Sequence, residues 1–221
     1  LNLHYRLEPS GISGVCAVPL NLAVQIPANA FSATPQFRIG GRKDVVDQMA
    51  HNPFTSHRMW QGPEDQSAKV WLYGSKDALH IKTEVVDDAH HQTNPVEQSY
   101  MGDGVQIAIH VPGQSSHWEI GLARLKDDSS AAFAWIQPRG YGSPVTKMNV
   151  STSRQGAVTT YKATIPYDAL MTDQAAFDKG VRFNMIINEN DGEGRDGWIQ
   201  IAPGIGESKN VEKYPFIVLR K

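Results

Sequence analysis

The segment GDGVQIAIHV, residues 102–111, carries the pattern that decides the fold. Val105, Ile107, Ile109 and Val111 alternate with small or polar residues, and a period of two is typical of a strand with one buried face. The same alternation recurs in about ten short segments bounded by turn-forming residues. Helical patterns are few and brief. The sequence therefore predicts an all-β chain, an antiparallel β-sandwich of the jelly-roll or immunoglobulin-like kind with few short helical turns.

Further strands are expected on both sides of this segment. Residues 69–73 and 79–85 alternate around a turn at 74–77, which predicts a hairpin. Pro166 is expected to begin a single helical turn. A second helical segment is expected over 44–51. The remaining strands are predicted near 20–26, 118–122, 133–135, 148–152, 161–165, 181–187, 198–202 and 216–219.

Composition excludes several classes of function. Twenty-one basic and 23 acidic residues among 221 give a formal net charge of −2. This balance provides no polycation for nucleic acid. We find no apolar run of the roughly 18 residues that a membrane helix needs. The sequence thus predicts neither a nucleic-acid nor a membrane partner.

The chain is expected to divide near residues 33–35. Residues 1–35 form either an extra strand segment or the tail of a preceding domain, and residues 36–221 form the sandwich. The chain begins at Leu1, which favours a mature form or a module of a longer protein. Cys16 is the single cysteine, so the fold depends on its core, with a metal ion as a further source of stability.

Five segments occur in an order that resembles the family 9 carbohydrate-binding modules and their DOMON-like relatives. They are SAKVWL at 67–72, VVDD at 85–88, GDGVQIAI at 102–109, YKATIP at 161–166 and NENDG at 188–192. The resemblance covers residues 37–219. It implies a two-sheet β-sandwich with a non-catalytic, sugar-binding role, bound calcium, and a place beside a catalytic domain in a secreted polysaccharide-degrading enzyme. A monomer is expected.

The resemblance also suggests where a sugar would bind. Members of the family hold the sugar between two aromatic rings and bond its hydroxyls with polar side chains. Tyr100 matches the first ring, Gln106 the position of a carboxylate, and Glu119 that of a basic residue. The loop at 203–210 should carry the second ring and has no aromatic residue, so the two-ring clamp is not reproduced.

The residues themselves point to the same face. Gln106 and Glu119 fall among small residues on the non-core side of two strands, which leaves room either for a sugar ring or for plain solvent. Trp135 and Tyr141 flank a loop that could form an aromatic platform. Trp198 and Arg195 complete the candidate carbohydrate-binding residues, whereas Trp118 is expected in the core.

Two acidic segments are candidate calcium sites. The loop at 188–197 is rich in side-chain oxygens and glycine, a composition that suits hard cations, although a self-capped polar turn or an ordering Arg195 ion pair would also explain it. Paired aspartates at a strand end form the second candidate. His90 and His91 follow directly and are expected at the surface. The predicted ligands are Asp87, Asp88, Asn190, Asp191, Glu193 and Asp196.

Two other functions remain open at this point. A sandwich that has lost its sugar site would serve as a structural or protein-interaction module. A small polysaccharide-active catalytic domain would need two opposed carboxylates, such as Asp87 with Glu119 or Glu84. With 23 acidic residues such pairs are easily drawn, so the sequence favours the binding module.

Overall fold

The computed structural model describes the side chains of residues 64–206 and 208–219. It also gives the backbone of four earlier strands: β1 (Asn2–Leu7), β2 (Ile12–Ala17), β3 (Val24–Ile26) and β4 (Phe37–Ile39). β1 and β2 pair as an antiparallel hairpin. The expected helical segment at 44–51 and the expected boundary at 33–35 lie outside the described residues.

One sheet has five antiparallel strands, which follow the order β10-β11-β6-β5-β4. Their bounds are Asn149–Gln155 for β10, Val158–Pro166 for β11, Ala78–Asp87 for β6 and Gln66–Gly74 for β5. β5 and β6 form the predicted hairpin, in which Gly74 pairs with Leu79 and Gln66 with Asp87.

The other sheet has the order β3-β14-β12-β7-β8-β9, with β13 paired to β12. The bounds are Phe216–Leu219 for β14, Val181–Glu189 for β12, Gly104–His110 for β7, Trp118–Arg124 for β8, Ser130–Ile136 for β9 and Gly197–Gln200 for β13. β3 runs parallel to β14, and the other pairs are antiparallel. We call this the seven-stranded sheet.

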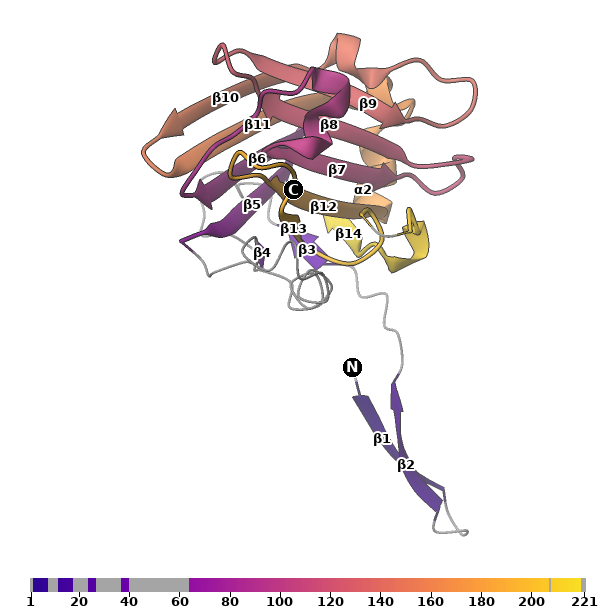
Figure 1. Cartoon of the computed structure of the whole chain (residues 1–221). Helices are drawn as coiled ribbons and strands as arrows, with labels where there is room; N and C mark the ends of the chain where they lie inside the picture. The colour runs from indigo at the N-terminus through magenta and orange to yellow at the C-terminus, as the bar shows by residue number, and fades with distance from the viewer. Residues whose placement is uncertain are drawn as a thin grey trace.

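Short helices connect the strands. They are η2 (Val96–Met101), η3 (Pro144–Lys147), η4 (Tyr167–Leu170), α2 (Gln174–Lys179) and η5 (Val211–Lys213). η4 is the helical turn predicted after Pro166. η2 lies against β7, β8 and β9, on the side of the seven-stranded sheet that faces the viewer in Figure 1. In the described part of the chain, no helix is long and apolar enough to cross a membrane.

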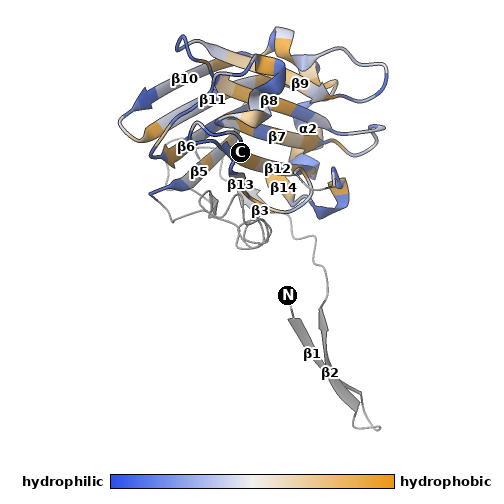
Figure 2. Ribbon diagram, in the orientation of Figure 1, coloured by the Kyte–Doolittle hydropathy of each residue, from blue (hydrophilic) through white to orange (hydrophobic). Residues whose placement is uncertain are grey.

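The core fills the space between the two sheets. Alternate residues of β5, β6, β7, β8, β11, β12 and β14 point into it, and Figure 2 shows the resulting change of colour along the ribbons. Trp118 is fully buried, as predicted. The predicted antiparallel β-sandwich is confirmed, and its period-two pattern also determines what faces outward. The largest fully buried side chains are Trp118, Tyr161, Tyr214, Phe177, Phe183, Leu72, Leu79, Ile81, Ile107 and Ile109.

Candidate functional site

The outer side of the seven-stranded sheet carries polar residues from β7, β8, β12 and β13, beside an apolar pair, Ala108 and Ile186, that Ile205 and Tyr214 cover. The inward residues Ile107, Ile120 and Ile187 belong to the core, so their strand neighbours point away from it. The register brings these neighbours side by side: Gln106 lies between Gly121 on β8 and Ile186 on β12. We call this surface the polar face. Its buried polar residues are Gln106, Glu119, Asn184, Asn188 and Gln200.

Glu119 is the centre of a charged network on the polar face. Its side chain is 2% exposed, and Lys209 Nζ lies 2.6 Å from Oε1. Gln106 Nε2 donates to the same oxygen at 3.3 Å, and His117 Nε2 lies 3.6 Å from Oε2. Burial alone would raise the pKa of Glu119, but the contacts and charges of His117 and Lys209 outweigh burial and lower it. The carboxylate is therefore ionised and anchors Lys209 over the sheet.

Two aromatic rings flank this network. Tyr100, at the end of η2, is 36% exposed and meets the ring of Trp135 edge-on, with ring centroids 6.0 Å apart. The indole of Trp135 donates to Glu97 O at 2.8 Å. A Cβ atom at Gly121 would lie 2.2 Å from the Trp135 ring, so that ring rests directly on the backbone of β8. Tyr100 thus has a fixed support and a free surface.

A third planar group lies at the far side of the polar face. The Arg195 guanidinium carbon is 4.7 Å from the ring centroid of Trp198 on β13. Arg195 Nη2 donates to Asn188 Oδ1 at 2.6 Å. Burial lowers the pKa of Arg195 to about 10, which leaves it charged at neutral pH. Among the described residues, Arg195 Nε and Asn188 Nδ2 have no hydrogen-bond partner.

The structure brings six of the seven predicted carbohydrate-binding residues to the polar face or its rim, in three pairs. Gln106 contacts Glu119, Tyr100 contacts Trp135, and Arg195 contacts Trp198.

Tyr141 is separated from the other predicted residues. Its ring stacks on the core residue Trp118, with centroids 5.9 Å apart and planes 8° apart, so Trp135 and Tyr141 do not form a shared platform. Sequence reasoning missed Lys209, His117 and Asn188. Lys209 was the available signal, since it is the only cation in the loop where an aromatic ring was sought.

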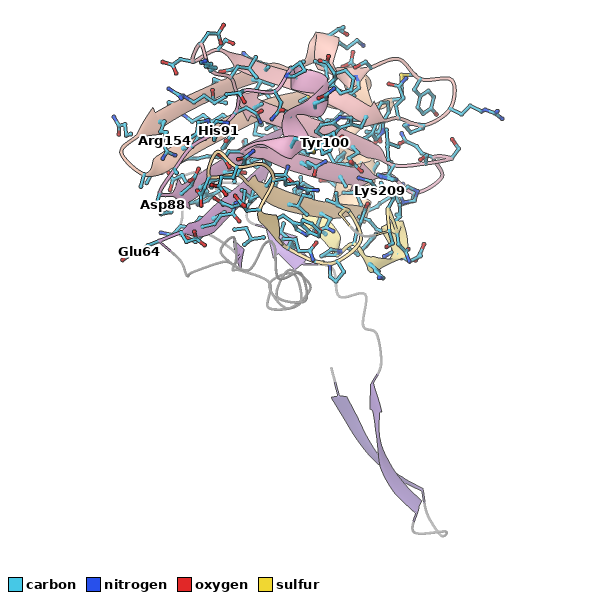
Figure 3. The ribbon with its side chains drawn as sticks, viewed as in Figure 1. Glu64, Asp88, His91, Tyr100, Arg154 and Lys209 are labelled. Atoms are coloured by element: carbon cyan, nitrogen blue, oxygen red, sulfur yellow. The ribbon has the colours of Figure 1, made fainter. Side chains whose placement is uncertain are left out.

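An acidic cluster lies at one end of the sandwich, where Figure 3 labels Asp88, His91 and Arg154. Three groups of ligand atoms there are close enough to share an ion, each within 4.8 Å: Asp65, Asp88 and Asp191; Asp87, Glu189 and Asp191; and Asp87, His90 and Asp103. The predicted ligands Asp87 and Asp88 thus each lie close to the predicted ligand Asp191. Sequence reasoning missed Asp65, Asp103 and Glu189, because they come together only when β5, β7 and β12 pack.

Four residues in or near this cluster have other surroundings than expected. Asn190 directs its side-chain oxygen to the backbone amides of Gly192 and Gly194, at 2.7 and 3.3 Å, and so caps its own loop. His90, which was expected at the surface, has a side chain only 9% exposed. Glu193 and Asp196 belong to none of the three groups, and Asp196 instead accepts from the Asp191 amide at 2.9 Å.

Glu189 shows that the acidic cluster suits a hard cation. It is 7% exposed, and neither carboxylate oxygen has a hydrogen-bond partner among the described residues. Burial, reinforced by the charges of Asp103, Asp87, Asp191 and Asp65, raises its pKa to about 11. Burial and neighbouring carboxylates likewise raise the pKa of Asp191 to about 6. Ca²⁺ prefers oxygen ligands, carboxylates among them, so a cluster of several carboxylates matches its chemistry.

Solved structures of proteins in complex with sugars share the fold of this chain. No family model and no curated protein matches the chain. A family 9 carbohydrate-binding module from Caldicellulosiruptor kristjanssonii in complex with cellotriose is 16% identical with a TM-score of 0.58, covering 90% of this chain and 94% of that one. A second structure from that organism, in complex with glucose, is 17% identical with a TM-score of 0.56, covering 89% and 95%. The chain therefore has the fold of these modules.

Proposed function

We propose that the chain is a non-catalytic carbohydrate-binding module that holds an oligosaccharide on the polar face. The observation that carries this proposal is the pairing of an exposed ring, Tyr100 on Trp135, with the ionised Glu119–Lys209 network beside it. Sugar recognition needs these two parts, an aromatic surface for the C–H face and charged or amide groups for the hydroxyls. The structures with this fold that hold cellotriose and glucose support the same ligand class.

The arrangement defines how the sugar would be held. Its ring would lie against Tyr100, with hydroxyls directed at Lys209, Gln106 and the guanidinium of Arg195. Lys209 has a side chain 46% exposed, so it can change partners from Glu119 to a ligand oxygen without leaving water. The fixed position of Trp135 limits the ordering cost of binding, because the ring beneath Tyr100 is already immobilised.

Calorimetric titration with cellotriose tests the proposal. We expect Tyr100→Ala and Trp135→Ala each to weaken binding about tenfold, the loss of one hot-spot contact. Tyr141→Ala is the matched control, because this half-buried ring lies away from the polar face, and its affinity should stay at the wild-type value. Equal affinity for all four proteins would overturn the proposed site. Absence of binding to any glycan would favour an interaction module, and release of reducing sugars would favour a catalytic domain.

We also propose that the acidic cluster binds structural calcium. The ion would be held by the carboxylates of Asp65, Asp88, Asp191, Asp87 and Glu189. It would replace the proton that the buried Glu189 carboxyl otherwise keeps. Adding calcium at about 100 times its Kd should stabilise the chelator-treated protein by about 2.7 kcal/mol. In Glu189→Gln this gain should shrink, whereas the exposed control Glu193→Gln should keep it. A melting temperature that calcium leaves unchanged would contradict the proposal.

Three further expectations concern the surroundings of the module. We predict a neighbouring catalytic domain of a polysaccharide-degrading enzyme. We also predict a secreted or extracytoplasmic location. The full reading frame tests both predictions. The monomeric state also stays a prediction, and light scattering after size exclusion measures it.

A further inference from the structure

His90 lies against two buried carboxylates just beyond the end of β6. Its Nδ1 atom is 3.7 Å from Asp87 Oδ2 and 3.6 Å from Asp103 Oδ2. The Asp87 and Asp103 side chains are 2% and 4% exposed, and that of His90 is 9% exposed. Nδ1 has no hydrogen-bond partner among the described residues. A ring nitrogen with more than nine-tenths of its side chain buried is thus directed at a pair of acidic groups.

The other ring nitrogen determines what Nδ1 can offer. His90 Nε2 lies 3.2 Å from the backbone oxygen of Arg124, and a carbonyl oxygen only accepts, so Nε2 carries a hydrogen. In the neutral ring, Nδ1 then presents a lone pair to the two carboxylates. A lone pair facing carboxylates calls for a cation between them. A backbone carbonyl that fixes the tautomer in this way is a common partner of metal-binding histidines.

We propose that Asp87, His90 and Asp103 bind a second divalent ion of the kind that accepts nitrogen, with Zn²⁺ as its representative. Bonds of about 2.0–2.1 Å in a tetrahedral site place ligand atoms roughly 3.3–3.4 Å apart, and Nδ1 lies only slightly farther than this from both carboxylates. The imidazole separates this site from the all-oxygen calcium site proposed above. Asp87 also belongs to a calcium group, so its carboxylate would bridge the two ions.

The ligands are held in place by the surrounding structure. Asp103 accepts from the Asn190 amide at 2.9 Å through Oδ1 and from the His91 amide through Oδ2. Asp87 Oδ1 accepts from the Ala89 amide at 2.9 Å. Hydrogen bonds of this kind orient metal-binding carboxylates and leave lone pairs free for the ion.

One cation already faces this site. Arg154 Nη1 is 3.6 Å from Asp87 Oδ2, and Nη2 donates to Asp87 O at 2.8 Å. This guanidinium offsets one of the two carboxylate charges. One negative charge therefore remains for a divalent ion to balance.

Zinc uptake in the presence of saturating calcium tests the site. A chelator first removes all metal from the full chain and is then removed itself. The protein is titrated with ZnSO₄ in about 5 mM CaCl₂, a concentration that keeps an all-oxygen calcium site filled even when its Kd is near 1 mM. We expect one equivalent of zinc, with affinity reduced about 100-fold or more in His90→Ala. His91→Ala is the matched control and should keep the zinc. Glu189→Gln should also keep the zinc while its stabilisation by calcium shrinks, so failure of the zinc proposal is distinguishable from failure of the calcium and glycan proposals.

A second measurement avoids any dependence on the folding of variants. In wild-type protein, the ¹⁵N resonance of His90 Nδ1 should move when zinc is added, and the Nε2 resonance should stay that of a protonated nitrogen. No zinc uptake at full calcium, or unchanged affinity in His90→Ala, would overturn the proposal.

Discussion

At the residue scale, Gly121 sets the position of the exposed rings. A side chain there would occupy the space of Trp135, since its Cβ would lie 2.2 Å from the indole. We expect Gly121→Val to displace Trp135, break its bond to Glu97 and destabilise the fold by about 1–3 kcal/mol, a typical overpacking cost. Cellotriose binding should weaken about tenfold, because Tyr100 loses its support. Gly142→Ala, which adds a methyl group in open space, should change neither the melting temperature nor the calorimetric Kd.

Glu119 predicts how stability responds to acid. Its folded-state pKa lies below the ordinary value of 4.5 that the unfolded chain has. A lowered carboxyl pKa contributes stability that is present above pH 4.5 and is lost as the pH falls through the folded-state pKa. Urea unfolding between pH 6 and pH 3 should therefore show a shallower loss of stability in Glu119→Gln than in the wild type. Parallel curves for the two proteins would contradict an ionised, paired Glu119.

The strand pattern alone placed Gln106 and Glu119 on one outer face. The contact between Lys209 and Glu119 could not be predicted, because it joins residues 90 positions apart and depends on a left-handed backbone at Lys209, with φ of 52°. The separation of Trp135 from Tyr141 was equally hidden. Both flank one loop, but whether a ring turns outward or onto the core Trp118 depends on tertiary packing.

At the scale of elements, the loop after β12 connects the acidic cluster to the polar face. Asn190 joins them: its amide donates to Asp103 Oδ1 at 2.9 Å, and its side chain donates to Met101 O at 2.7 Å. Met101 follows Tyr100 in η2. The position of Tyr100 therefore depends on a loop that carries both Arg195 and the proposed calcium ligand Asp191.

Asn190→Ala should loosen the Met101 end of this connection and the loop itself, while the backbone amide keeps its bond to Asp103. It leaves the Met101 carbonyl and two loop amides without their partner, at a cost of about 2 kcal/mol in unfolding free energy. We expect cellotriose to bind several-fold more weakly, because Tyr100 and Arg195 both lose order. Asn149→Ala, an exposed change on β10, is the control for thermal melting and calorimetry. A variant that melts and binds like the wild type would show that the loop is held by other contacts.

The same scale explains which elements the sequence predicts well. Regular strands such as β7 and β8 bury one face, so a period of two marks them. η2 has no such signal: it is a short 3₁₀ helix, VEQSYM, whose one buried residue is Ser99. The site depends on η2 for Tyr100, which is why the fold could be predicted more fully than the site.

At the scale of the whole molecule, the sandwich separates two sites and keeps them connected. The acidic cluster lies at the end where β5, β6, β7 and β12 meet, and the polar face covers one sheet. Figure 3 shows Asp88 at that end, with Tyr100 and Lys209 on the face toward the viewer. Asp103 and Asn190 link the two through the hydrogen bonds described above. An ion bound in the proposed site would order this region and so reduce the ordering cost of binding a glycan.

Calcium and glycan should therefore strengthen each other's binding. Coupling of this kind is commonly about 1–3 kcal/mol, which corresponds to a roughly 5- to 150-fold change in affinity, and it must be equal in both directions. We expect cellotriose to bind at least about fivefold more tightly in calcium than in chelator, and calcium to bind more tightly by the same factor when cellotriose is saturating. In Asn190→Ala the factor should approach one, because the link is cut while the ion ligands and the rings remain. Equal cellotriose affinities with and without calcium in the wild type would show that the cation stabilises the fold without reaching the polar face.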